Sequence, residues 1–317
     1  MRPIHLAALI CALGVQPAAA QDRMTLMLDW FVNPNHGPIL LADDLGLFEE
    51  AGLEVEIVAP ADPTAPPKMV AAGEADLAVS YQPQQHLQVA EGLPLLRVGT
   101  LMPMPTNCVL VRADSDIESI ADLQGRTVGF SVAGVEEALL TRILAEAGLG
   151  LGDIEMVNVN FSLAPALMAG QVDAVIGAVR NFTPVQMAIE GVPGRCFNLE
   201  EEGLPSYDEL IYVANAEAVA EPAHADMLER FLAATEQAAQ RIVNDPEGAW
   251  ETISSTRAEL RDELNARAWE QTWARFSLAP AALDAGRYAR FEAFMAEAGL
   301  IEGTRPVSEI AVDLGAR

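Results

Sequence analysis

The chain has 317 residues, of which 51% are hydrophobic and 21% are charged, and this composition excludes disordered and fibrous proteins. It carries 46 acidic and 19 basic residues. The resulting net charge of −27 repels phosphate backbones, so we predict no nucleic-acid partner.

The N-terminal segment, residues 1–20, has the features of a secretory signal peptide. A single basic residue, Arg2, precedes an apolar run at residues 6–15, and three alanines at 18–20 end the segment. Small residues at that place are typical of a cleavage site. The apolar run is too short to span a bilayer. We therefore expect cleavage of residues 1–20 and a periplasmic mature protein.

Short apolar strands alternate with amphipathic helices over the first two hundred residues. We predict strands at Met24–Leu28, Glu54–Val58, Leu77–Ser80, Leu95–Leu101, Thr127–Phe130, Glu155–Val159 and Ala174–Ala178. Helices are predicted at Ile39–Ala51, Gln84–Glu91 and Val135–Ala147, and a helical C-terminal tail at Ala223–Asn244, Pro246–Ser254, Arg257–Phe276 and Ala281–Ala298. This alternation predicts an α/β protein with largely parallel sheets flanked by helices.

Two segments repeat one pattern at an offset of 97 residues. In Ala71–Val79 and again in Met168–Ile176, a helix ends at a glycine, an aspartate follows three residues later, and an apolar strand begins. The repeat indicates two lobes of like construction, joined by crossings near Val111–Asp114 and Tyr207–Val213. The lobe boundaries that we expect are residues 21–112 plus 212–317 for lobe 1 and residues 113–211 for lobe 2.

Two cysteines lie beyond the predicted signal peptide, Cys108 and Cys196. An oxidising compartment permits a disulfide between them. A chain of this length does not need one, however, and the sequence does not show whether the two residues lie within bonding distance. Both alternatives stay open.

Polar and aromatic side chains directly follow several predicted strands, at the sheet edge where open α/β folds bind ligands. The candidate residues are Asp29, Trp30, Asn33, Asn35, His36, Tyr81, Gln82, Ser131, Glu136, Glu137, Arg180, Asn181 and Tyr207. Structural roles are the alternatives: Asn35 can cap a helix, Trp30 can fill core space, the glutamates can complement a helix dipole, and Arg180 can pair with a surface acid.

Enzymatic alternatives have weaker motifs. Gly129-x-Ser131-x-Ala133 approaches the nucleophile elbow of serine hydrolases, but alanine replaces the second glycine. We find no histidine or cysteine pair at metal-ligand spacing and no phosphate-binding loop, so we expect no metal and no nucleotide cofactor.

Several of these segments together resemble one family, the periplasmic substrate-binding proteins of ABC importers for thiamine pyrimidine precursors. The similarity extends from about Met24 to Asn215. It is carried by Asp29-Trp30 with Asn33-Pro34-Asn35-His36, Leu45-Gly46-Leu47-Phe48, Ala72-Gly73 with Asp76 and Ser80-Tyr81, Val135-Glu136-Glu137-Ala138, and Arg180-Asn181-Phe182. The Gly-Leu-Phe and Ala-Gly segments recur in related importers for sulfonates, nitrate and riboflavin, and they support the fold alone.

The resemblance implies a two-lobed periplasmic-binding-protein fold of type II that closes on hydroxymethylpyrimidine or a formylaminopyrimidine. Trp30 and Tyr81 would hold the ring by stacking. The residues that would contact its nitrogens and substituents are Asn35, Glu136, Asn181 and Tyr207. The expected partners are a membrane permease and an ATPase, and we expect a monomer without enzymatic activity. A riboflavin- or sulfonate-binding protein is the alternative within this fold.

The family is also related to fungal enzymes that synthesise the thiamine pyrimidine. That branch uses lysine-bound pyridoxal phosphate and a cysteine-rich motif. This chain has one lysine, Lys68, and no cysteine cluster. We therefore expect no cofactor, and a pyridoxal-phosphate-dependent synthase remains the enzymatic alternative.

Overall fold

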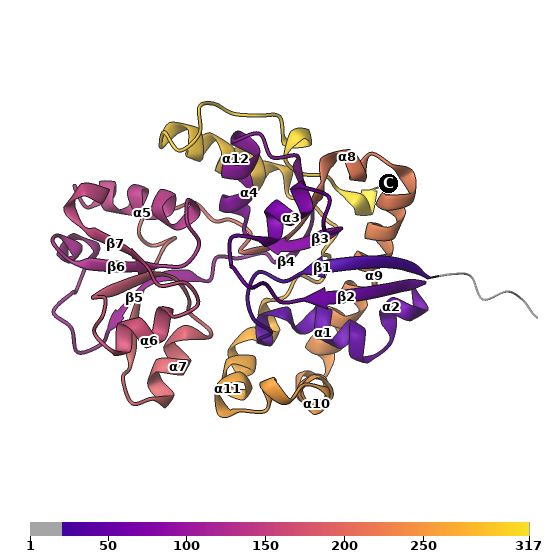
Figure 1. The fold of residues 1–317 in the computed structure, drawn as a ribbon, viewed down its shortest axis with the longest axis horizontal. Coiled ribbons are helices and arrows are strands. Elements are labelled where there is room, and N and C mark those ends of the chain that lie inside the picture. Colours follow the sequence, from indigo (N-terminus) through magenta and orange to yellow (C-terminus); the bar gives the residue numbers. More distant parts are fainter. Residues whose placement is uncertain (1–20, 317) are drawn as a thin grey trace, which may run out of the picture.

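The computed structural model describes residues 21–316, so the predicted signal peptide at residues 1–20 lies outside the described residues. Two five-stranded sheets lie side by side, and helices flank each of them (Figure 1). We call the sheet that holds the first strand, with its helices, lobe 1, and the other sheet with its helices lobe 2. The predicted α/β architecture with two lobes is confirmed.

The sheet of lobe 1 contains strands from both ends of the chain. Its strands are β1 (Asp22–Met27), β2 (Leu53–Val58), β3 (Leu77–Ser80), β4 (Leu95–Met102) and β10 (Leu210–Asn215). They lie in the order β2-β1-β3-β10-β4. β1 pairs in parallel with β2 and β3, whereas β10 runs antiparallel to β3 and β4. The sheet is therefore largely parallel, as predicted, with one opposed strand that the sequence did not indicate.

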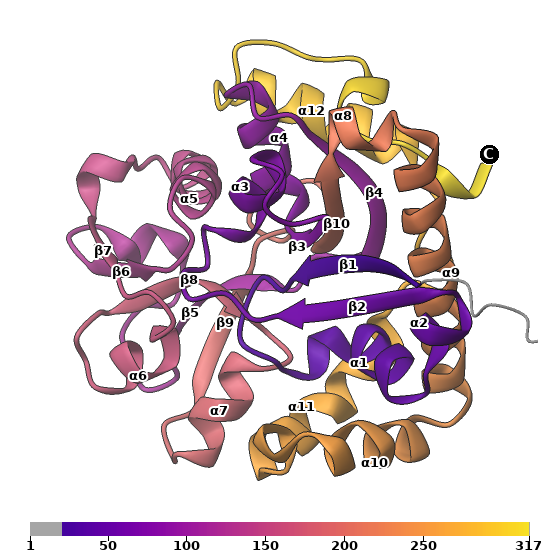
Figure 2. The ribbon, with the colours of Figure 1, turned by 45° about the vertical axis from the view of Figure 1, so that its right-hand side comes forward.

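Helices cover both faces of this sheet because its strands are apolar on both sides (Figure 2). Leu26 and Leu28 belong to the core that includes α1 and α9, whereas Met27 belongs to the core beneath α3. The helices of lobe 1 before the crossing are α1 (Gly37–Asp44), α2 (Leu47–Glu50), α3 (Pro66–Ala71) and α4 (Gln82–Ala90). Those of the C-terminal part are α8 (Ala216–Val219), α9 (Pro222–Asn244), α10 (Pro246–Thr256), α11 (Glu263–Thr272) and α12 (Ala285–Glu297).

Lobe 2 repeats the arrangement. Its strands are β5 (Asn107–Arg112), β6 (Thr127–Phe130), β7 (Glu155–Asn158), β8 (Ala174–Val179) and β9 (Gly194–Asn198), in the order β7-β6-β8-β5-β9. β6 is parallel to β7 and β8, and β5 is antiparallel to β8 and β9. Its helices are α5 (Val135–Glu146), α6 (Leu163–Met168) and α7 (Thr183–Ile189). Each sheet thus has one strand that is antiparallel to the other four.

The chain crosses between the sheets twice, at residues 103–106 and at 199–209. We call these the two crossing segments. The boundary expected at 112/113 left β5 in lobe 1, but β5 pairs with β8 and β9 in the second sheet. The first crossing, expected near Val111–Asp114, lies earlier in the chain, because Asn107–Arg112 forms a buried strand inside the second sheet.

Two predicted helices are interrupted. The helix predicted at Ile39–Ala51 divides into α1 and α2, because Gly46 between them adopts a left-handed φ of 69°. The helix predicted at Arg257–Phe276 is α11, preceded by a 3₁₀ turn at Ala258–Leu260 and followed by one at Trp273–Arg275.

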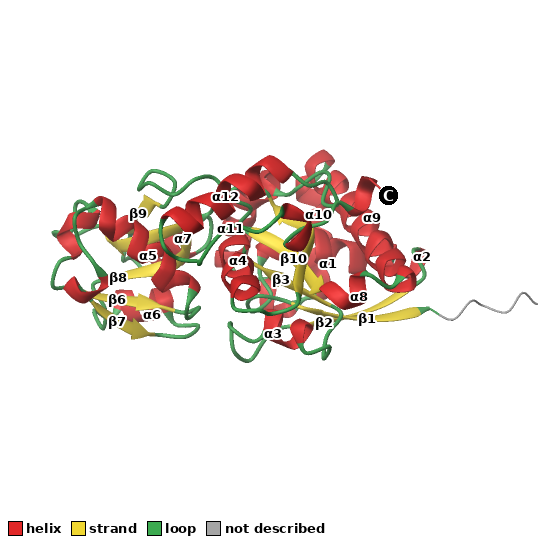
Figure 3. Cartoon of the chain, turned by 90° about the horizontal axis from the view of Figure 1, so that it is seen from above, coloured by secondary structure: helices red, strands yellow, loops and turns green. Residues whose placement is uncertain are grey.

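The C-terminal helix α12 contacts both lobes. Phe291 and Met295 share one hydrophobic core with Leu139 of α5 (Figure 3). On the lobe 1 side, Glu292 bonds to the buried His86 of α4. α12 therefore packs across the junction of the two lobes.

The segments that flank α12 are held to lobe 1 by Arg97 of β4, whose side chain is fully buried. Its guanidinium donates to the carbonyl oxygens of Pro280 at 3.3 Å, Ala282 at 2.5 Å and Val312 at 3.2 Å. A buried cation needs such partners. Arg97 thus fixes the C-terminal segments to the sheet.

The structure contains a disulfide between Cys108 of β5 and Cys196 of β9, with Cα atoms 5.5 Å apart. The two strands are neighbours in the antiparallel ladder, which brings the two residues within reach of each other. This resolves the alternative that the sequence left open. Within residues 21–316, each helix is too short or too polar to cross a bilayer.

Candidate functional site

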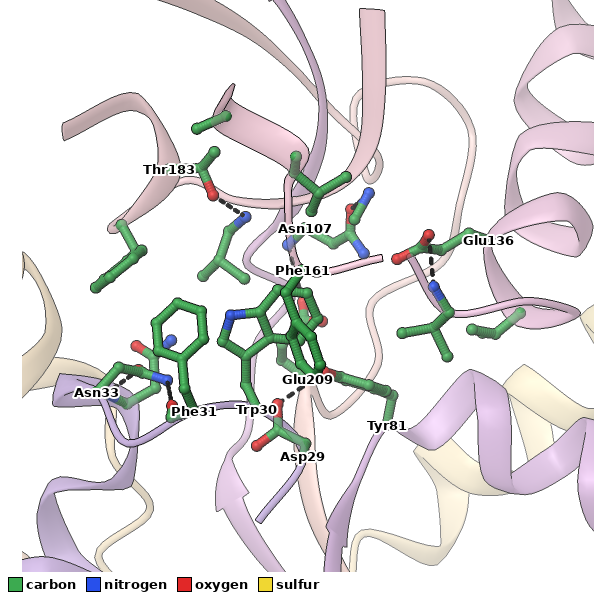
Figure 4. A pocket seen from close by; sticks show the side chains of 18 of the residues that line it. Asp29, Trp30, Phe31, Asn33, Tyr81, Asn107, Glu136, Phe161, Thr183 and Glu209 are labelled. Atoms are coloured by element: carbon green, nitrogen blue, oxygen red, sulfur yellow. Dashed lines mark hydrogen bonds between the residues drawn. The ribbon is translucent and has the colours of Figure 1, made fainter. Parts of the chain in front are cut away.

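A pocket lies between the two lobes, and both lobes and a crossing segment supply its wall. The residues that line it include Asp29, Trp30, Phe31, Asn33, Asn35 and Tyr81 from lobe 1, Asn107, Glu136, Phe161, Gly177, Phe182 and Thr183 from lobe 2, and Tyr207 and Glu209 from the second crossing (Figure 4). Most follow the carboxyl end of a strand, which is where open α/β sheets bind ligands.

Aromatic side chains from both lobes meet at this pocket. Trp30 packs edge-on against Phe161, with ring centroids 4.5 Å apart. The ring centroids of Phe31 and Phe182 lie 6.1 Å apart, and Phe31 is 42% exposed. Trp30 and Tyr81 line the same pocket, which is the arrangement that a ring held by these two residues requires.

Tyr81 is oriented by a buried carboxylate. Its hydroxyl donates to Asp29 Oδ2 at 2.7 Å, and His36 Nε2 donates to Asp29 Oδ1 at 2.9 Å. The Asn33 amide donates to His36 Nδ1 at 3.3 Å, which leaves the ring proton on Nε2. Burial raises the pKa of Asp29, but the bonds from His36 and Tyr81 outweigh it, so the pKa lies below its ordinary value. Asp29 therefore stays ionised and positions Tyr81.

Asn35 and Asn181 connect the lobes beside the aromatic residues, and Asn33 holds Asn35 in place. Asn33 caps the turn at Pro34–His36 by accepting from the Asn35 amide at 2.9 Å. Asn35 Oδ1 accepts from Asn181 Nδ2 of lobe 2 at 2.7 Å, and Asn181 also donates to Thr272 Oγ1 at 2.6 Å. Asn181 thus lies behind Asn35, whose own Nδ2 remains available at the pocket.

Glu136, at the start of α5, presents a carboxylate to the pocket. Its Oε2 accepts from the amides of Ser131 at 2.6 Å and Val132 at 3.0 Å. A Cβ at Gly177, whose φ is 90°, would lie 2.0 Å from Glu136 Oε1, so a glycine is needed there. Burial raises the pKa of Glu136 to about 8. The site therefore holds a carboxyl group that readily exchanges a proton near neutral pH.

Glu209 is a second buried carboxylate, which the sequence analysis did not select. Its Oε2 accepts from the amides of Thr106 and Asn107, the latter at 2.9 Å, and from the Tyr207 hydroxyl at 3.4 Å. Burial raises the pKa of Glu209, and burial and the neighbouring Glu209 together raise that of Tyr207.

Of the thirteen predicted residues, the structure places seven along the pocket: Asp29, Trp30, Asn33, Asn35, Tyr81, Glu136 and Tyr207. The other six have structural partners: His36, Gln82, Ser131, Glu137, Arg180 and Asn181. Gln82 Oε1 accepts from the Asp208 amide at 2.7 Å, Glu137 accepts from the Gly134 amide, and Arg180 binds Glu200 through both terminal nitrogens.

The residues that the sequence analysis missed are chiefly apolar. Phe161 follows β7, so the rule that selected Asp29 after β1 could have found it. Phe182 belongs to the segment Arg180-Asn181-Phe182, and Phe31 directly follows the selected Trp30. Glu209 lies two residues after the selected Tyr207 at the predicted return crossing, but its partners Thr106 and Asn107 are about a hundred residues away in sequence, so its own role had no local signal.

Neither a pyridoxal phosphate site nor a hydrolase site fits these residues. Lys68 belongs to α3, does not line the pocket and bonds to Thr64 Oγ1 at 3.4 Å, so no lysine there could form a Schiff base. The Ser131 hydroxyl donates to the Asn160 carbonyl rather than to a histidine. Residues 21–316 contain no cluster of three or more metal-ligating side chains.

Comparison with known proteins shows which family the chain belongs to. Residues 33–249, more than half of the chain, match the model of a family described as NMT1/THI5 like. The chain belongs to the NMT1/THI5-like family. The resemblance stated from the sequence is thereby confirmed, since the NMT1/THI5-like relatives include a formylaminopyrimidine-binding protein.

The proteins similar to this chain include a binding protein and synthases. A Haemophilus influenzae protein named for thiamine biosynthesis is 47% identical over 94% of this chain and 94% of its own length. The formylaminopyrimidine-binding protein of Halalkalibacterium halodurans is 33% identical over 77% of this chain and 74% of its own. The 4-amino-5-hydroxymethyl-2-methylpyrimidine phosphate synthase of Legionella pneumophila is 26% identical, with 82% of each chain covered.

Among solved structures, the alkanesulfonate-binding protein SsuA of Xanthomonas axonopodis superposes with a TM-score of 0.73. The match covers 93% of this chain and 99% of that one at 20% identity. It confirms the predicted periplasmic-binding-protein fold for this NMT1/THI5-like chain.

Proposed function

We propose that this chain is the extracytoplasmic solute-binding protein of an ABC importer, and that it captures a thiamine pyrimidine precursor by closure of its lobes. A permease and an ATPase are the proposed membrane partners. The observation that carries the proposal is the pocket in which Trp30, Tyr81 and Phe161 surround a space that also holds the carboxylate of Glu136. Hinged closure of two lobes is an established way to enclose such a ligand.

The chemistry of the pocket favours an amino-substituted aromatic ring. Flat aromatic walls suit a planar ring, and the Glu136 carboxylate accepts hydrogen bonds from ring N–H and amino groups. Arg180, the cation predicted at the site, binds Glu200 at 2.7 Å and does not line the pocket. The lining contributed by the described residues includes no Arg, Lys or His, so a sulfonate or nitrate would meet no cation there.

The contacts between the two lobes at the pocket wall also affect the affinity for the ligand. A ligand of about 10 heavy atoms can gain at most roughly 1.5 kcal/mol per atom. High affinity then requires near-complete enclosure, and the contacts between Trp30 and Phe161 and between Asn35 and Asn181 bring the lobes together around the pocket. These contacts support capture by closure.

Calorimetric titration of the mature chain tests the proposal. We expect binding of hydroxymethylpyrimidine or formylaminopyrimidine, and none of an alkanesulfonate or riboflavin. Trp30→Ala should weaken binding at least ten-fold, whereas Trp273→Ala, a partly buried tryptophan away from the pocket, should not. Failure of every pyrimidine to bind would overturn the substrate assignment.

The synthase relatives define a second assay. Because Lys68 lies outside the pocket, we expect added pyridoxal phosphate to keep the absorbance of the free aldehyde. A new band at the wavelength of a lysine Schiff base, lost in Lys68→Met, would favour the enzymatic alternative.

A further inference from the structure

We propose that Glu209 is a second ligand-binding carboxylate of this pocket, so that the ligand must present N–H or O–H donors to two separate carboxylates, Glu136 and Glu209. The inference rests on the proposed function and adds a specificity-determining residue to the site. It also defines the ligand class as small rings with donor groups on two edges.

The position of Glu209 supports this role. It lies in the second crossing segment, lines the pocket and is 3% exposed. Its carboxylate is held on one side, where Oε2 accepts from the amides of Thr106 and Asn107. Within residues 21–316, Oε1 makes no hydrogen bond. One oxygen is thus fixed by the backbone, and the residue itself lines the pocket, so we expect the other oxygen to face a ligand.

Burial of the Glu209 carboxyl group indicates that its Oε1 needs a hydrogen-bond partner. A carboxylate removed from water is costly unless it is paired or fully hydrogen-bonded. The nearby cation, Arg180, is already bound to Glu200 through Nη1 and Nη2, both at 2.7 Å, and its Nε and Nη2 point at the Thr106 and Asn107 carbonyls. A donor on the ligand would complete the hydrogen bonding of Glu209.

Glu136 presents its carboxylate in the same way from a different element. Its Oε2 is held by two backbone amides, and within the described chain its Oε1 has no hydrogen-bond partner. Glu136 comes from the start of α5 and Glu209 comes from the second crossing segment, so the two carboxyl groups reach the pocket from different elements (Figure 4). Two such groups select a ligand by the placement of its hydrogen-bonding groups.

Glu209 also connects the ligand to the junction between the lobes. Its bonds to Thr106 and Asn107 join the second crossing segment to the first. A ligand bonded to Oε1 would therefore contact the very group that holds the two crossings together.

The experiment compares wild type, Glu209→Gln and Glu201→Gln by calorimetric titration with 4-amino-5-hydroxymethyl-2-methylpyrimidine. Glutamine can still accept from both backbone amides, but it turns a donor toward the ligand. We expect Glu209→Gln to lose about ten- to hundred-fold in affinity, the range for a hydrogen bond to a charged group. Glu201→Gln, at an exposed position of the same segment, should bind as wild type does. Thermal melting verifies that each variant is folded.

A ligand series on the wild type keeps the inference falsifiable if Glu209→Gln does not fold. Removing the amino group and the hydroxyl in separate analogues should each cost affinity, because each removes a donor. Undiminished binding by folded Glu209→Gln, or by both analogues, would overturn the role of Glu209 while the proposed function stands. Failure of the wild type to bind any pyrimidine would instead overturn the proposed function, and the inference with it.

Discussion

Replacing Glu136 by glutamine should stabilise the ligand-free protein while weakening ligand binding. Burial raises the pKa of Glu136 from 4.5 to about 8, so the folded state binds the proton more tightly than the unfolded state does. Between these two pH values the unfolded state carries fewer protons, and stability therefore falls as pH rises. A pKa unit corresponds to 1.36 kcal/mol, which makes the penalty about 3 kcal/mol at pH 7.

Urea unfolding of wild type and Glu136→Gln, from pH 5 to pH 8, measures this penalty. Glutamine accepts from the amides of Ser131 and Val132 as the carboxylate does, but it does not titrate. The difference in unfolding free energy between the two proteins should grow with pH in favour of the variant, by about 3 kcal/mol over this interval. Glu137→Gln, at the partly exposed neighbouring position, is the control. A difference that stays constant with pH would refute the reasoning.

Three other substitutions test the framework around the site. Gly177→Ala should reduce pyrimidine affinity at least ten-fold in a calorimetric titration, because its Cβ would displace Glu136 Oε1; wild-type affinity would contradict this. Arg97→Met should lower the unfolding free energy by about 3 kcal/mol, since it leaves buried carbonyls unpaired, and an unchanged melting temperature would disprove that role. Joint replacement of Cys108 and Cys196 by serine should cost about 3 kcal/mol, measured by urea unfolding; equal stability with and without reductant in the wild type would show that the disulfide does not form.

Much of the lobe architecture could be predicted because it follows from local patterns. The buried run at Leu77–Ser80 is a strand as predicted, and the residues after it supply Tyr81 to the pocket. β5, β9 and β10 were not predicted as strands, because each forms through antiparallel pairing with residues far away in sequence. Local periodicity carries no information about such partners.

The same limit applies to the site. Trp30 could be selected because it follows a strand, and Glu136 because it lies in the first turn of the helix after one. Arg180 was selected on the same ground, but its charge is taken up by Glu200, twenty residues later. Glu209 could not be selected, because its environment depends on the amides of the other crossing segment. Sequence patterns thus located the sheet edge at which the pocket lies. Which polar side chains there lack a partner within the protein depends on contacts between residues far apart in sequence.

The disulfide lies where the first crossing segment enters the second sheet and the second crossing segment leaves it. Cys108 follows the first crossing by two residues, and Cys196 precedes the second by three. β5 and β9 therefore cannot separate at that end when the molecule opens. We therefore expect movement of one lobe against the other to change the backbone within residues 103–106 and 199–209, since the disulfide holds β5 and β9 together beside these segments.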